Sequence, residues 1–142
     1  MTAIKLNNTL SLKDCYDMTL KMGDKVEGGW RQFYVVILAI TAWGLIANVS
    51  SFAIGPKLII LFTVLTFTVH NCIALLKMYS ILAILTKETY ARATEFHFLV
   101  PENIALFRQA SGAISFDRVR ILVVGTHSLC FLVVCYIYLS RS

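Results

Sequence analysis

The chain has 142 residues, of which 58% are hydrophobic and 15% are charged, and its net charge is +5. Soluble domains average about 45–50% apolar and about 25% charged residues, so this composition excludes a chain built around an ordinary soluble core. The apolar residues are concentrated in three blocks, which leave no room for a second domain. We therefore expect a single all-α integral membrane domain over residues 1–142.

The segment 11–27 predicts an amphipathic helix. Ser11 and Asp14 form a capping-box-like start. Apolar and small residues then recur every three or four positions up to Val26, while charged residues take the other faces. Such a helix can lie on the membrane surface or pack on another helix, and its mixed charge favours packing on protein. Gly28-Gly29 is expected to interrupt this helix before the first span.

Three largely uncharged segments are long enough to cross a bilayer, which needs about 20 helical residues. They are 33–52, 58–77 and 121–139. The helical pattern of the second segment continues toward residue 90, as a helix that leaves the membrane. The sequence therefore predicts three transmembrane helices.

The connections between these spans differ in length. Gly55-Pro56 predicts a tight turn, so the first two spans are expected to form an antiparallel hairpin. Residues 86–120 are the only sizeable polar connection. We expect them to form a short helical cap on the cytoplasmic face, with a helix from Pro101 to Ala110.

Basic residues are distributed unevenly about the spans. Lys57 and Arg141 lie on one side, whereas the other eleven lie in the N-terminal segment, in the 86–120 connection or at Lys77. The positive-inside rule then predicts a cytoplasmic (inner) membrane protein with its N-terminus in the cytoplasm and its C-terminus outside. Because this distribution accounts for the basic excess, no nucleic-acid partner is expected.

Polar residues occur inside the predicted spans, where they are costly without partners. The second span carries a polar stripe on one helical face: Thr63, Thr66, His70 and Lys77. Asn71 faces about 100° away from His70. His70 and His127 each lie seven residues from a basic residue at the cytoplasmic boundary, so both are predicted about 10 Å deep.

These residues support three alternatives. His70, Asn71 and His127 can form hydrogen bonds between helices. The polar stripe can instead line a hydrated path in an oligomer. As a third alternative, the imidazoles of His70 and His127 can hold a haem or a metal. We expect no cofactor, because bulky apolar residues crowd the positions next to both histidines.

The remaining features indicate packing and not chemistry. The sequence has no nucleotide-binding, hydrolase or metalloprotease motif, so we expect no catalytic and no metal-ligating residues. The four cysteines form no C-x-x-C pair. Small residues at Ala47, Ser51 and Gly55 recur every four positions, which predicts a helix-packing seam in lipid.

The function that these patterns favour is a non-catalytic membrane subunit, either homo-oligomeric or bound to other membrane subunits in the lipid bilayer. One alternative is an ion channel lined by the polar stripe. Another is a haem-binding membrane anchor of a redox complex. In size and span count the chain resembles the small haem-anchoring subunits of succinate dehydrogenase, and this resemblance assigns no ligand residue to the chain.

Overall fold

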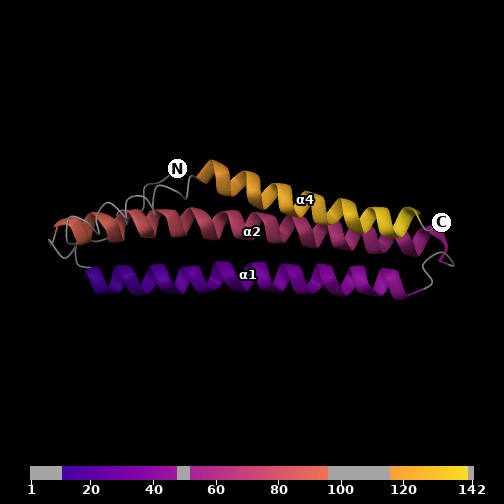
Figure 1. The fold of residues 1–142 in the computed structure, drawn as a ribbon, viewed down its shortest axis with the longest axis horizontal. Coiled ribbons are helices and arrows are strands. Elements are labelled where there is room, and N and C mark those ends of the chain that lie inside the picture. The colour runs from indigo at the N-terminus through magenta and orange to yellow at the C-terminus, as the bar shows by residue number, and fades with distance from the viewer. Residues whose placement is uncertain (1–10, 48–51, 96–115, 141–142) are drawn as a thin grey trace.

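The computed structural model describes residues 11–47, 52–95 and 116–140, which form three α-helices and no strand. These helices are α1 (Leu12–Ile46), α2 (Ile54–Glu95) and α4 (Phe116–Ser140). α1 and α2 run antiparallel, and α4 packs beside the N-terminal part of α2 (Figure 1). Each helix is long and apolar enough to cross a membrane. The expectation of an all-helical chain with three such helices is confirmed.

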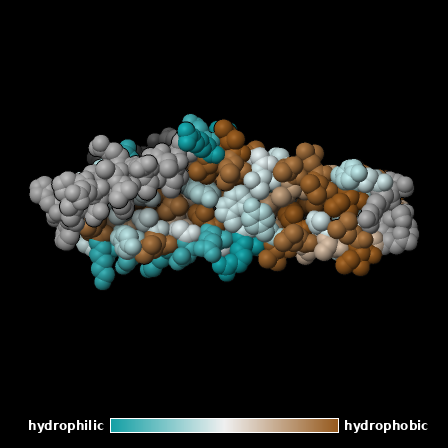
Figure 2. Space-filling model, in the orientation of Figure 1, coloured by the Kyte–Doolittle hydropathy of each residue, from teal (hydrophilic) through white to brown (hydrophobic). Residues whose placement is uncertain are grey.

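α1 and α2 are longer than a bilayer requires. At about 1.5 Å per residue they span roughly 50 and 60 Å, against about 30 Å for the hydrocarbon core. We call residues 12–24 of α1 and 80–95 of α2 the stalk. Figure 2 shows hydrophilic residues along the α1 side of this half and hydrophobic residues over the opposite half. The stalk therefore projects beyond the apolar part of the molecule.

α1 begins at the capping box that Ser11 and Asp14 predicted. The Asp14 backbone N–H donates to Ser11 Oγ over 3.2 Å, and the Ser11 backbone N–H donates to Asp14 Oδ2 over 3.0 Å. The Ser11 hydroxyl donates a further bond to the same carboxylate, and these bonds hold the pKa of Asp14 below its usual value. The first turn of α1 is thus fixed by its own sequence.

The predicted interruption at Gly28-Gly29 is wrong, because both residues lie inside α1. A glycine inside a helix costs about 1 kcal/mol relative to alanine. Packing offsets that cost, since a Cβ on Gly29 would lie 2.9 Å from Leu75 Cδ2. The absence of a side chain lets α1 approach α2, and the continuous helix follows from this tertiary contact.

The predicted turn at Gly55-Pro56 is also wrong, because both residues lie in the first turn of α2. Proline is tolerated there, since the N–H groups of a first turn have no acceptor within the helix. α1 ends at Ile46, before the predicted boundary at residue 52. α2 continues to Glu95, so residues 86–95 are helical, whereas the predicted cap helix at 101–110 lies outside the described residues.

The buried faces of α1 and α2 follow a regular repeat. Positions that alternate by four and three residues along α2 are buried or half-buried: Lys57, Leu61, Val64, Thr68, Asn71, Leu75, Met78, Leu82, Leu85 and Thr89. α1 shows the same alternation from its first turn onward: Cys15, Thr19, Met22, Val26, Gly29 and Phe33. A mean spacing of 3.5 residues is that of a left-handed coiled coil. One seam therefore joins the stalk to the apolar half.

α4 closes the apolar half through Tyr138. This ring is fully buried against α1, where a Cβ on Gly44 would lie 2.7 Å from Tyr138 Cε2. The Tyr138 hydroxyl donates to the Ile40 carbonyl over 3.1 Å, which holds the ring in place. Gly44 is thus a close-contact point between α1 and α4.

We predict that Gly44→Ala destabilises the protein by about 1–3 kcal/mol, because the anchored ring of Tyr138 cannot yield to an added methyl group. The free energy of unfolding in mixed micelles, followed by far-UV circular dichroism, measures the loss. Gly125→Ala is the matched control, since nothing lies within 4 Å of a Cβ there. Equal stability of the Gly44→Ala variant and the wild type would show that the ring is not fixed.

Candidate functional site

A hydrogen bond between α2 and α4 lies inside the apolar half. His127 Nε2 lies 3.0 Å from Asn71 Oδ1, and both side chains are buried, at 2% and 8% exposure. His127 Nδ1 lies 2.8 Å from the carbonyl oxygen of Val123 on its own helix. Both ring nitrogens are therefore engaged. We call Asn71 and His127 the buried polar pair.

The chemistry of the buried polar pair follows from these two contacts. A carbonyl oxygen only accepts hydrogen bonds, so His127 Nδ1 carries a hydrogen and donates to Val123. In a neutral ring Nε2 then accepts, and the NH₂ group of Asn71 satisfies it once the amide is turned. With the amide oxygen facing Nε2, the ring must instead be doubly protonated. A neutral ring is the form that avoids a buried charge.

Aromatic residues of α1 cover this pair. The Phe33 ring stacks on His127 with centroids 3.9 Å apart, and the Trp30 ring centroid is 5.4 Å away. The Trp30 indole N–H donates to the Tyr79 hydroxyl over 3.0 Å, which ties α1 to α2 at the same level. All three helices thus meet around His127. Sequence reasoning did not predict that Trp30 and Phe33 cover His127, although Phe33 falls on the α1 repeat.

Thr68 lies one turn from Asn71 on the same buried face of α2. Its side chain is 5% exposed, and its hydroxyl has no hydrogen-bond partner among the described residues. The other threonines on α2 within the apolar half behave differently, since Thr63 and Thr66 donate to carbonyl oxygens of their own helix over 2.9 Å. Thr68 adds a polar group to the bundle interior beside the buried polar pair.

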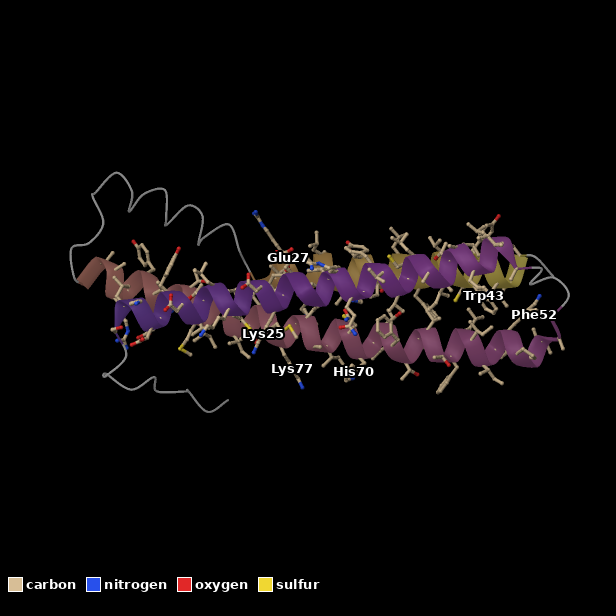
Figure 3. The ribbon with its side chains drawn as sticks, turned by 90° about the horizontal axis from the view of Figure 1, so that it is seen from below. Lys25, Glu27, Trp43, Phe52, His70 and Lys77 are labelled. Atoms are coloured by element: carbon tan, nitrogen blue, oxygen red, sulfur yellow. The ribbon has the colours of Figure 1, made fainter. Side chains whose placement is uncertain are left out.

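The polar stripe predicted on the second span lies on the outer face of α2. Thr63, Thr66, His70 and Lys77 are all exposed. Figure 3 shows His70 and Lys77 on the side of α2 that faces away from α1. The stripe therefore lines no path inside a single chain.

The structure does not bring His70 and His127 together. His127 faces Asn71, one residue further along α2, while His70 points out of the bundle. The two histidines that the structure describes therefore cannot ligate opposite sides of one haem within a single chain. The described residues also contain no group of three side chains arranged to hold a metal ion.

The predicted seam of Ala47, Ser51 and Gly55 does not lie on one helix. Ala47 caps the end of α1 and Gly55 lies in the first turn of α2, while Ser51 is outside the described residues. Nothing lies within 4 Å of a Cβ on Gly55, so it makes no close helix contact here. Gly29 and Gly44 are the glycines at which helices approach closely.

No protein-family model, curated protein or solved structure matches this chain. We therefore infer its function from the placement of its own residues.

We predict that Asn71 and His127 are energetically coupled by about 0.6–2 kcal/mol, the range for hydrogen bonds between membrane helices. A double-mutant cycle with Asn71→Leu and His127→Leu, read as free energy of unfolding in micelles, measures this coupling. His70→Leu is the matched control, because His70 does not contact His127; its effect should add to that of His127→Leu within about 0.5 kcal/mol. Additive effects in the Asn71 cycle would contradict the prediction.

Proposed function

We propose that this chain is a non-catalytic membrane subunit that binds another membrane helix along the outer face of α2. The observation that carries the proposal is the exposure of His70 on a helix apolar enough to cross a membrane. Among the described residues, its imidazole makes no hydrogen bond. A partner helix would supply the hydrogen-bonding group that the described part of the chain does not.

The neighbouring polar residues need no partner. The hydroxyls of Thr63 and Thr66 are satisfied by their own helix. Lys77 lies at the end of the uncharged stretch, and its long side chain can reach the headgroup region. His70 is seven residues deeper, about 10 Å along the helix, and its short side chain cannot. An unsatisfied polar group in hydrocarbon costs several kcal/mol, so a partner at His70 is favoured.

The charge on this face bears on the identity of the partner. Two copies of the chain in one membrane orientation, meeting squarely through this face, would place Lys77 against Lys77. Like charges in that position are unfavourable. A different membrane helix, with a hydrogen-bonding group level with His70, fits the face better than a second copy.

We predict that a variant with photoreactive benzoylphenylalanine in place of Ile73, expressed in native membranes, forms a covalent adduct with a second polypeptide on illumination. Ile73 lies on the same face between His70 and Lys77 and is 48% exposed. Leu132 on α4, 63% exposed, is the matched control and should label lipid. The adduct mass distinguishes a second copy from another subunit.

Adducts with lipid alone at both positions would contradict the subunit proposal. The channel alternative requires the same face to line a path between several chains. It would gain support if Ile73 captured only copies of this chain and planar-bilayer recording gave a conductance that His70→Ala altered.

We place the chain in the cytoplasmic membrane with its N-terminus inside. The start of α1 and the end of α4 lie at opposite ends of the bundle (Figure 1), as three spans require. Combined with the positive-inside rule, this predicts that alkaline phosphatase fused after Ser142 is active outside the cell. A green fluorescent protein at the N-terminus should fluoresce. A reporter at Ser142 that proved to be cytoplasmic would contradict this orientation.

A further inference from the structure

Contacts between the three helices fix one level along the long axis, where the stalk meets the apolar half. Val26, Leu75 and Val123 form a buried cluster there, one residue from each helix. Trp30 and Tyr79 join through their hydrogen bond at the same place. Residues within a turn or two of this cluster therefore lie at nearly the same height.

Charged residues at this level are mostly basic. All are exposed, and all three helices contribute; we call them the basic girdle: Lys21, Lys25, Arg31, Lys77, Arg118 and Arg120. Asp24, Glu27 and Asp117 are the acidic residues at this level, and Glu27 is paired with Arg31 over 2.9 Å. Figure 3 shows Lys25, Glu27 and Lys77 close together along the axis.

The stalk beyond the girdle has the opposite balance. Its basic residues are fewer than its acidic ones: Lys13, Lys87 and Arg92 against Asp14, Asp17, Glu88 and Glu95. The excess of positive charge is therefore confined to one level and is not a property of the whole polar half. Within the described residues, the girdle's Lys25, Lys77, Arg118 and Arg120 form no ion pair.

Aromatic residues accompany the girdle on its apolar side. Trp30 stacks on Tyr34 with ring centroids 5.6 Å apart, and Tyr34 is 45% exposed. Tryptophan and tyrosine next to lysine and arginine are typical of the level at which lipid headgroups lie. The girdle therefore lies where phosphate groups would surround it.

We propose that the basic girdle binds the headgroups of anionic phospholipids. Its cations point outward from three helices, so one docked protein could not contact them all, whereas headgroups surround the bundle on every side. Each lysine or arginine at the level of anionic headgroups raises the association constant for them by about a factor of five. This interaction shares Lys77 with the outer face of α2 proposed to bind a partner, and the other girdle residues lie on α1 and α4.

Quenching of Trp30 fluorescence by brominated lipids tests the proposal. Trp43→Phe leaves Trp30 as the single tryptophan, since the chain has two. The full-length protein is reconstituted in phosphatidylcholine bilayers with increasing brominated phosphatidylglycerol or brominated phosphatidylcholine. We expect the relative association constant to favour phosphatidylglycerol by roughly fivefold or more at low salt, and to fall as salt is added.

Two triple variants of equal charge separate the girdle from net charge. The girdle variant combines Lys77→Gln, Arg118→Gln and Arg120→Gln. Its association constant for phosphatidylglycerol relative to phosphatidylcholine should fall close to one. Lys13→Gln, Lys87→Gln and Arg92→Gln, all on the stalk beyond the girdle, should leave it within about twofold of the parent, because that part of the stalk lies beyond the headgroups. Equal quenching by the two lipids in the parent protein would overturn the proposal. An equal loss in both triple variants would overturn it as well.

Discussion

Polar side chains in the apolar half have to find their hydrogen-bond partners in protein, because the hydrocarbon core of a bilayer offers no water. The chain meets this constraint in different ways. His127 is paired with Asn71 inside the bundle, and the exposed threonines of α2 bond to their own helix. His70 has neither kind of hydrogen-bond partner among the described residues. The outer face of α2 is therefore the surface that points to a function.

The buried polar pair also defines how the helices are rotated. α4 can place His127 on Asn71 only when Val123, one turn before it, joins Val26 and Leu75 in the buried cluster. Phe33 from α1 then covers the imidazole. A polar contact in an apolar surrounding thus selects one arrangement of helices whose surfaces are otherwise largely apolar, because another rotation would leave the pair unsatisfied.

Sequence patterns were sufficient to predict the three helices. An uncharged stretch of about 20 residues in a bilayer can satisfy its backbone hydrogen bonds within one segment only as a helix. Helix boundaries were less predictable. Local preference predicts a helix break at Gly28-Gly29 and a turn at Gly55-Pro56. Both pairs are helical instead, because Gly29 packs on Leu75 and the first turn of a helix tolerates proline.

The candidate site was predictable in depth but not in rotation. Counting residues from the basic boundary placed His70 and His127 at one level, yet the residue that meets His127 is Asn71. Apolar residues surround each span, so the hydrophobic pattern does not say which face is buried. The alternating spacing through Leu61, Val64, Asn71 and Leu75 carried that information, and it becomes visible only once α1 shows the same repeat.

The continuous seam between α1 and α2 has a structural consequence. Thr19 and Thr89 meet at 3.1 Å in the stalk, and the same repeat leads without a break to Gly29 and Leu75. The stalk is therefore a direct continuation of the packed helices and not a separate linker. Its end at Glu95 stands about 25 Å beyond Met78, given the rise of a helix. The end of the stalk is thus built from the same two helices that, with α4, enclose His127.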